Sequence, residues 1–186
     1  MTMSQVKSPP FTIHDYRKMP DDGHYYQVIE GELYMSPAPS NFHQIIVGNI
    51  YFIFRSFLQV NPIGQVRVSP FDVYLTPNTV VQPDVLYVSK ENAAIIIDAG
   101  VEGAPDLVVE ILSPGTRALD LGPKRAIYAR TGVKELRIVD PIALTIQVYR
   151  LQINAELPEA AYNATATFTS PLLPGLTIST AEIFQQ

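Results

Sequence analysis

Two segments of the chain are apolar at nearly every position, and each begins with the dipeptide Pro-Asp. They span residues 83–88 and 105–112. A strand that is apolar on both faces is typical of the middle of a sheet that helices cover on each side. These segments therefore predict an α/β (α+β) fold in which a central mixed β-sheet is flanked by helices.

Periodicity and capping signals predict the helices around this sheet. Over residues 41–59 apolar residues recur at the spacing of one helix face, with Gln44 at the third helical position. A second helix is expected at about 122–131, with Pro123 in its first turn and Gly132 at its C-terminal cap. Capping pairs predict two short helices, one near each end of the chain: Thr12 with Asp15, and Ser179 with Glu182.

Alternation and turn residues predict further strands. Residues 25–29 and 32–35 flank Glu30-Gly31 and are expected to form an N-terminal hairpin. Residues 136–140 and 144–150 alternate between apolar and polar side chains, which predicts a half-exposed hairpin. Strands are also expected at residues 65–69 and 71–75.

Length and composition predict one domain. The chain has 186 residues, 47% of them hydrophobic, which is enough for a sizeable core. We expect a disordered tail over residues 1–10 and a single domain over residues 11–186. Residues 1–10 contain no apolar core of signal-peptide length, and no run approaches the roughly 18 apolar residues of a membrane span. The expected location is therefore the cytoplasm, with no membrane partner.

The charged residues and the absence of cysteine restrict the chemistry. With no cysteine in the chain, disulfides, thiolate metal sites and a cysteine nucleophile are excluded, so a metal ion would bind oxygen or imidazole. A formal net charge of −5 argues against a general, electrostatically driven nucleic-acid binder. Residues 117–137 nevertheless hold six basic and only two acidic residues. Such a run is most often a solvated helix face.

Glu110 is the residue that points most directly to function. It lies in the middle of an apolar strand, where an unpaired carboxylate is costly to bury. A basic partner, protonation or a bound metal ion relieves this cost, and the last two indicate a functional site. A structural ion pair or a solvent-exposed end of the sheet explains the pattern equally well at this point.

A metal site needs a second carboxylate, and Asp84 and Asp106 are the two candidates. Asp106 lies on the same strand as Glu110, four residues away, so their Cα atoms would be roughly 13 Å apart. The ligand oxygens of one small hard cation lie within roughly 4 Å of each other. Asp106 is therefore a poor partner, more suited to capping the start of its strand. Asp84 has no such limit if its strand lies beside that of Glu110.

Pro83-Asp84 followed by an acid in a strand, Glu110, resembles the motif of the PD-(D/E)xK nuclease superfamily. That motif has a lysine two residues after the second acid, where this chain has Leu112. Some branches take the lysine from the helix that follows, and Lys124 lies in that predicted helix. Further segments resemble a restriction-endonuclease family over about residues 25–184: residues 31–33, His43, and residues 71–75, 81–84, 104–114, 120–124, 128–132 and 173–176.

This resemblance implies a restriction-endonuclease-like fold and a metal-dependent DNA phosphodiesterase. Asp84 and Glu110, with the carbonyl group of Ile111, would bind Mg²⁺ or Mn²⁺, while Lys124 would orient the attacking water. A homodimer is left open. The resemblance and the basic run together suggest three phosphate-binding residues, Arg117, Arg125 and Arg130, and three residues that support the site, Glu32, His43 and Tyr128.

The supporting residues include one departure from the family pattern and two positions with a structural alternative. Relatives commonly have Tyr-Glu before the hairpin turn, where this chain has Tyr26-Gln27. Glu32 is then the better candidate for an assisting acid, with Glu30 as the alternative, although Glu30 is better explained as a solvent-facing turn residue. A lone histidine at a helix edge, such as His43, is more often structural. Tyr128 lies four residues from Lys124, on the same helix face.

Two rival functions remain at this stage. A nuclease-fold module that binds nucleic acid or protein without cleaving it would explain Leu112, Gln27 and the acidic net charge. A glycosidase with two catalytic carboxylates is disfavoured, because Lys124 would have no role and the chain has no Trp to stack on a sugar. Metal binding that depends on Asp84 and Glu110 separates the nuclease from the inactive module.

Overall fold

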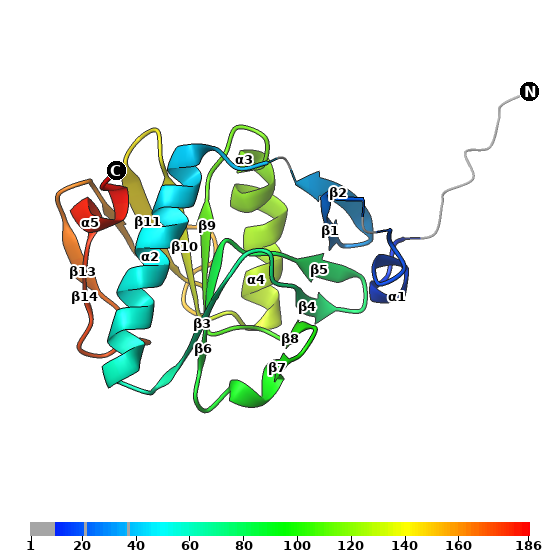
Figure 1. The fold of residues 1–186 in the computed structure, drawn as a ribbon, viewed down its shortest axis with the longest axis horizontal. Coiled ribbons are helices and arrows are strands. Elements are labelled where there is room, and N and C mark those ends of the chain that lie inside the picture. The colour runs from blue at the N-terminus through cyan, green and yellow to red at the C-terminus, as the bar shows by residue number, and fades with distance from the viewer. Residues whose placement is uncertain (1–9, 21, 37) are drawn as a thin grey trace, which may run out of the picture.

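A mixed six-stranded sheet forms the centre of the protein (Figure 1). The structure is a computed structural model and describes residues 10–20, 22–36 and 38–186. The spatial order of its strands is β12-β11-β10-β9-β6-β3. The β9–β10 pair is parallel, and the other neighbouring pairs are antiparallel. Its strands are β3 (Gly64–Val68), β6 (Val85–Ser89), β9 (Leu107–Ile111), β10 (Glu135–Asp140), β11 (Thr145–Arg150) and β12 (Ala160–Tyr162).

Helices α2 (Asn41–Val60) and α4 (Arg125–Thr131) cover opposite faces of this sheet. On one face the apolar stripe of α2 packs against alternate residues of β9, such as Val109. On the other face Tyr128 of α4 packs near Val108. Every residue of β9 is consequently buried. The prediction of central strands covered on both sides is confirmed.

The long helix α2 is confirmed, with its cap shifted by one residue. Ser40 is the N-cap: its backbone is extended, and its hydroxyl accepts a hydrogen bond from the His43 amide at 3.2 Å. A hydroxyl at this position satisfies one of the free amides of the first turn. The helix therefore begins with Asn41 as its first helical residue and ends before Asn61-Pro62.

The predicted N-terminal hairpin belongs to a second sheet. Strands β1 (Tyr25–Ile29) and β2 (Glu32–Ser36) pair in the expected register around Glu30 and Gly31, both with positive φ. A side chain on Gly31 would collide with Pro10, so glycine is required there. The spatial order is β2-β1-β5-β4-β8-β7. The other strands are β4 (Val73–Thr76), β5 (Thr79–Val81), β7 (Ile96–Ile97) and β8 (Gly100–Glu102), with a 3₁₀ turn η1 (Ala93–Ile95) before β7.

The helical segment before α4 begins earlier than the sequence predicts. It consists of α3 (Arg117–Leu119) and a π-helical turn η2 (Asp120–Lys124), followed directly by α4. Pro123 lies inside the π turn and not in a first helical turn. Because proline has no amide hydrogen, it removes a potential hydrogen bond from the π turn. The first turn starts instead at Ser113, whose carbonyl accepts from the Arg117 amide at 2.9 Å. Gly132 ends α4 with φ of 105°, as predicted.

The prediction that the β10–β11 hairpin is half-exposed was wrong for β10. Its first five residues are buried, because β9 and β11 flank the strand and both faces of the sheet are covered. The polar residues that suggested exposure, Glu135 and Arg137, form an internal ion pair at 2.7 Å. Alternation of polar and apolar residues indicates exposure only where the polar side chains have no partner inside the fold.

The ends of the described chain carry short elements. Helix α1 (Ile13–Tyr16) has the capping box predicted from Thr12 and Asp15. Ser179 occupies the N-cap of α5 (Thr180–Phe184) but makes no side-chain cap hydrogen bond, so that capping box was wrong. Apart from Pro10, the predicted tail lies outside the described residues. No helix in the described ranges is long and apolar enough to cross a membrane. Strands β13 (Thr167–Thr169) and β14 (Thr177–Ser179) precede α5.

Candidate functional site

The pairing of β6 with β9 brings Asp84 and Glu110 together. The two strands are antiparallel, and Val85 lies opposite Val109. Continuing this register by one residue sets Asp84 opposite Glu110. Opposite residues of an antiparallel pair have Cβ atoms roughly 4.5–5.5 Å apart, so these two carboxylates share one site.

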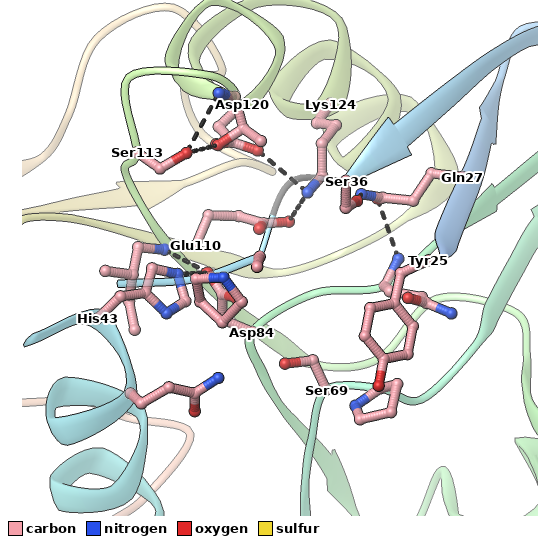
Figure 2. Close-up of a pocket in the computed structure, with 17 residues that line it drawn as sticks. Tyr25, Gln27, Ser36, His43, Ser69, Asp84, Glu110, Ser113, Asp120 and Lys124 are labelled. Carbon is pink, nitrogen blue, oxygen red and sulfur yellow. Dashed lines mark hydrogen bonds and ion pairs between the residues drawn. The ribbon is translucent and has the colours of Figure 1, made fainter. Parts of the chain in front are cut away.

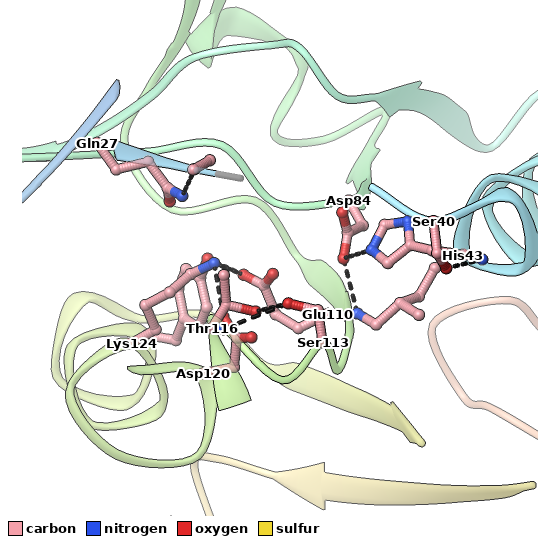
Figure 3. Close-up of polar contacts among 12 residues, drawn as sticks. Gln27, Ser40, His43, Asp84, Glu110, Ser113, Thr116, Asp120 and Lys124 are labelled. Atoms are coloured by element: carbon pink, nitrogen blue, oxygen red, sulfur yellow. Dashed lines mark hydrogen bonds and ion pairs between the residues drawn. The ribbon is translucent and has the colours of Figure 1, made fainter. Parts of the chain in front are cut away.

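The Asp84 carboxylate is held by two groups from different elements (Figure 3). Its Oδ2 atom accepts a hydrogen bond from the Ile111 amide at 2.7 Å and lies 3.3 Å from Nε2 of His43. His43 is buried in the first turn of α2. Burial lowers the pKa of its imidazole, but the Asp84 carboxylate outweighs this effect and the net pKa is raised. A proton on His43 is therefore stabilised beside Asp84, which fixes the carboxylate in place.

Glu110 receives its contacts from the helical segment after β9 (Figure 2). Its Oε1 atom lies 2.6 Å from Nζ of Lys124 and accepts a hydrogen bond from the Tyr128 hydroxyl at 2.5 Å. Nζ of Lys124 also lies 3.1 Å from Oδ1 of Asp120. Asp120 and Lys124 both come from the π turn η2 and are buried. Lys124 is thus positioned between two carboxylates.

Three carboxylates surround one ammonium group in this cluster, and the pKa values reflect that balance. Burial raises the pKa of Glu110 to about 8; Lys124 opposes this shift, and the carboxylates of Asp120 and Asp84 add to it. Burial lowers the pKa of Lys124, but the carboxylates of Glu110 and Asp120 raise it by a larger amount, so the net shift of the pKa is upward. Lys124 therefore stays charged, and the three carboxylates outnumber the cationic groups of Lys124 and His43 whenever Glu110 is ionised.

These groups line one pocket. Glu110, Asp84, Lys124 and His43 face it from the central sheet and its two helices, whereas Gln27 faces it from the second sheet. The remaining polar lining comes from α2, η2, loops and strand ends: Tyr25, Ser36, Gln44, Ser69, Gln82, Ser113, Thr116 and Asp120. Tyr128 lies behind Glu110 and does not line the pocket, so it positions that carboxylate from within the core.

Gln27 of the hairpin lines the pocket, whereas Glu32 does not. Gln27 is buried. Its side-chain amide donates to the Ser36 hydroxyl at 2.8 Å and accepts from the main-chain amide of Gln82 at 3.1 Å. Glu32 is exposed and binds the Tyr34 hydroxyl at 2.7 Å. The expectation that Glu32 assists the site is not supported, because Glu32 lies opposite Ile29 at the turn end of the hairpin and does not line the pocket.

The three arginines expected to bind phosphates are engaged elsewhere. Arg117 pairs with Asp140 at 2.8 Å, and Arg130 pairs with Glu30 at 2.6 Å. Arg125 bonds to three main-chain carbonyls and to the Glu156 carboxylate. None of the three lines the pocket described above. Each guanidinium already has an acid partner, so the basic run is largely neutralised within the fold.

Asp106 lies apart from this site, as the distance argument predicts. Its carboxylate accepts from the Ser89 amide at 2.7 Å and from Nζ of Lys134 at 2.6 Å. Burial raises the pKa of Asp106, but these two hydrogen bonds lower it by more. Asp106 is a structural acid that ties the start of β9 to the end of β6.

Sequence reasoning missed Asp120 and Gln27 as site residues. Asp120 could have been found from its position four residues before Lys124, the spacing of side chains that meet on one helix face. Gln27 carried no local signal beyond its difference from the Tyr-Glu of relatives. Its place in the pocket depends on how the second sheet packs beside the first.

The donor set fits a hard divalent cation. Mg²⁺ is usually held by one or two carboxylates together with water and substrate phosphate. Asp84 and Glu110 provide two carboxylates, and the main chain at Ile111 adjoins both. No group of three or more His, Cys, Asp or Glu side chains with metal-binding spacing occurs in the described ranges, so main-chain carbonyl oxygens or water would complete the coordination. The deficit of positive charge around Glu110 also favours a cation.

A mixed sheet whose adjacent strands carry an Asp and a Glu, with a lysine from the next helix, has the arrangement of the PD-(D/E)xK nuclease fold. The chain belongs to the Uma2 family, described as "Putative restriction endonuclease", whose model matches residues 13–181.

A solved structure supports this assignment of the fold. It is described as a putative nuclease belonging to DUF820 from Anabaena variabilis ATCC 29413. It shares 20% sequence identity with this chain at a TM-score of 0.77, and the alignment covers 94% of this chain and 98% of that one. No functionally curated protein matches the sequence significantly.

Proposed function

We propose that the protein is a metal-dependent endonuclease that hydrolyses phosphodiester bonds in DNA. The observation that carries this proposal is the position of Lys124: its Nζ atom lies 2.6 Å from the Glu110 carboxylate, which the strand register sets opposite Asp84. Two carboxylates and an ammonium group on one pocket wall are the groups that phosphodiester hydrolysis needs. Membership of the restriction-endonuclease family supports the same reaction.

Each residue has a specific part in this proposal. Mg²⁺ or Mn²⁺, when bound, would polarise a phosphoryl oxygen and lower the pKa of the attacking water. Asp84 and Glu110 would hold the ion, and Asp84 is already oriented by the Ile111 amide and His43. The Lys124 ammonium would orient the water and offset the negative charge that develops at phosphorus.

Cleavage assays test the proposal directly. Linear, supercoiled and single-stranded DNA would each be incubated with the protein in Mg²⁺ and in Mn²⁺. We expect cleavage by the wild type and none by Glu110→Gln. Glu32→Gln is the matched control, because it makes the same chemical change on the exposed hairpin and should retain full activity.

Metal titration decides between an active nuclease and an inactive module. Calorimetry should detect Mn²⁺ binding by the wild type that Asp84→Asn and Glu110→Gln each remove. If Mn²⁺ does not bind and no DNA is cut, the protein is a nuclease-fold binding module. The cytoplasmic location and the homodimer stay predictions that separate experiments must address.

A further inference from the structure

Two arginines line one groove between α2 and the edge of the central sheet. Arg55 comes from the exposed side of α2, and Arg67 comes from β3, the edge strand of the central sheet. Tyr51, Gln65 and Val66 complete the lining. Within the described ranges, no carboxylate pairs with either arginine. In this respect both differ from the arginines of the 117–137 segment.

The Arg67 side chain is held in a defined position without losing its charge. Nη1 donates to the Val66 carbonyl at 2.9 Å, and Nη2 donates to Oε1 of Gln65 at 2.6 Å. Its guanidinium also lies over the Phe71 ring, 6.0 Å from the centroid. A guanidinium has five N–H donors, so further donors stay free for a ligand. Neutral acceptors and an aromatic ring orient this cation but do not neutralise it.

Two elements of the fold, α2 and the strand β3 with the residues after it, contribute residues to both the groove and the pocket. Ser69, two residues after Arg67, lines the pocket, and its amide donates to the Asp84 carbonyl at 3.1 Å. The distance from Arg67 to Ser69 is about 6.6 Å along an extended strand. Gln44 of α2 also lines the pocket, and Arg55 lies eleven residues further, or about 16 Å along the helix axis.

We propose that the groove between Arg55 and Arg67 binds backbone phosphates of the nucleic-acid strand whose reacting phosphate lies in the Asp84–Glu110 pocket. The inference rests on the proposed function and gives the direction in which the bound strand extends from the pocket. Backbone phosphates of one strand repeat every 3.4 Å along the duplex axis. Arg67 and Arg55 would therefore contact phosphates about two and five nucleotides from the reacting one.

The backbone phosphates of a nucleic-acid strand suit these residues. An arginine fork binds phosphate oxygens in pairs, and the Tyr51 side chain at the groove offers another donor. The negative pocket alone would repel a polyanion, so a neighbouring cationic groove is needed to hold the strand beside it. The groove thus supplies the attraction that the net charge of −5 does not.

Fluorescence anisotropy with a labelled DNA duplex tests the groove. Binding would be measured from low to moderate salt, both in Ca²⁺, which is also bound by oxygen ligands, and in EDTA. We expect Arg55→Gln/Arg67→Gln to weaken binding about tenfold at low salt, and the slope of log K against log salt to decrease by about 0.9 per lost contact. The control Arg117→Gln/Arg130→Gln removes the same charge from two arginines that already have acid partners and should leave the slope unchanged.

A second measurement locates the contact. Single neutral methylphosphonate groups, placed about two to five nucleotides to one side of the reacting phosphate, should weaken binding of the wild type but not of Arg55→Gln/Arg67→Gln. Equal effects on both proteins would overturn the inference. Equal salt slopes for the double variant and its control would do the same, as would a wild type that binds no DNA in either buffer.

Cleavage of the same duplex in Mn²⁺ keeps the two proposals separate. A wild type that cuts DNA, together with a double variant that binds like its control, refutes the groove and leaves the nuclease intact. A wild type that never cuts, but loses DNA affinity only on Arg55→Gln/Arg67→Gln, refutes the nuclease and supports the groove. Melting temperatures of the variants confirm that folding is unchanged.

Discussion

Three buried acids of this protein have surroundings that differ in kind. Glu135 is bound by two guanidinium groups and a serine hydroxyl, and Asp106 is bound by Lys134 and a main-chain amide. In both cases the fold itself compensates the charge. Glu110 receives Lys124 and Tyr128 on one oxygen and lines a pocket. A buried acid whose partners leave it facing a cavity is the one to associate with chemistry.

The first prediction at the residue scale concerns Glu110 and pH in the absence of metal. Its pKa of about 8 in the folded protein lies above the ordinary value of 4.5, so the native state binds a proton that the unfolded chain has lost. The free energy of unfolding should therefore fall as pH rises from 5 to about 8, by up to about 1.4 kcal/mol for each pH unit. Thermal melts across this range measure it.

The comparison with Glu110→Gln isolates this effect. His43 also has a raised pKa, and its contribution to stability is lost over the same range as pH rises. Glu110→Gln should reduce the slope, and it should melt at a higher temperature than the wild type near pH 8. A lower melting temperature of Glu110→Gln at that pH would mean that Glu110 is half of a structural ion pair.

The second residue-scale prediction concerns Glu135, whose role is structural. Glu135→Gln leaves the buried Arg137 and the nearby Arg150 without their shared carboxylate. Breaking a buried pair in this way costs about 3–5 kcal/mol of stability, which urea unfolding would measure. Glu159→Gln removes an exposed partner of Arg150 and should cost less than about 1 kcal/mol. Similar losses for both variants would contradict the assignment.

At the scale of elements, the π turn η2 decides where the lysine of the site points. It directs both Asp120 and Lys124 inward at the start of the helical run that covers the sheet. Leu112 lies two residues after Glu110 in the chain, on the same side of β9, and packs in the core near Tyr128. An ammonium group on the helix can thus occupy the region that a strand lysine would reach.

A rescue experiment tests this equivalence of helix and strand. Lys124→Ala should remove most cleavage activity and leave Mn²⁺ binding nearly unchanged, because Lys124 is not a metal ligand. Adding Leu112→Lys should restore part of the rate, since a lysine there starts about 6.6 Å along the strand from Glu110. The rescue should be incomplete, because burial of Leu112 contributes about 1.5–3 kcal/mol that a lysine stem recovers only in part.

The control for the rescue is Leu112→Met/Lys124→Ala, which changes packing without adding charge. Cleavage rates at saturating Mg²⁺ would be compared for the wild type, the single variant and both double variants. A folded lysine double variant that is no faster than the methionine control, or a fully active Lys124→Ala, would rule out the assignment of Lys124.

At the scale of the whole molecule, the pocket lies where two sheets meet. The central sheet and its helices supply Asp84, Glu110 and Lys124, whereas the second sheet supplies Gln27 from β1. Gln27 accepts a hydrogen bond of 3.1 Å from the main-chain amide of Gln82, which follows β5 of the second sheet and precedes β6 of the central sheet. Residue 27 therefore lines the same pocket as the carboxylates of Asp84 and Glu110.

Gln27→Glu should strengthen metal binding. A carboxylate at residue 27, added to those of Asp84, Glu110 and Asp120, increases the attraction for a divalent cation, and its oxygen can still accept from the main-chain amide of Gln82. We expect the affinity for Mn²⁺ to rise about tenfold, or 1.4 kcal/mol, and the metal-free protein to lose stability through repulsion between carboxylates. Calorimetric titration of Mn²⁺ and thermal melts without metal would measure the two effects.

Leu33→Glu is the control for added charge. It places the same acid on the exposed face of β2, away from the pocket, and should leave Mn²⁺ affinity unchanged. An equal gain for both variants would show that net charge, and not the position of residue 27, determines metal affinity.

The sequence by itself determined the long helix α2, the N-terminal hairpin and the central acid of the site. The period of α2, the hairpin turn at Glu30-Gly31 and the apolar run around Glu110 are local patterns, and each reports a backbone conformation or a degree of burial without reference to distant residues. Simple strand geometry also separated Asp84 from Asp106, because that argument needs only the rise per residue.

Only the tertiary structure decided which side chains meet. The β6–β9 register that sets Asp84 opposite Glu110, the burial of β10 and the acid partners of Arg117 and Arg130 all depend on contacts between residues far apart in the chain. The same holds for the choice of Gln27 over Glu32. Local patterns constrain the conformation of a segment, whereas charge compensation and pocket lining depend on which segments pack together, and that is settled when the two sheets and their helices close around the core.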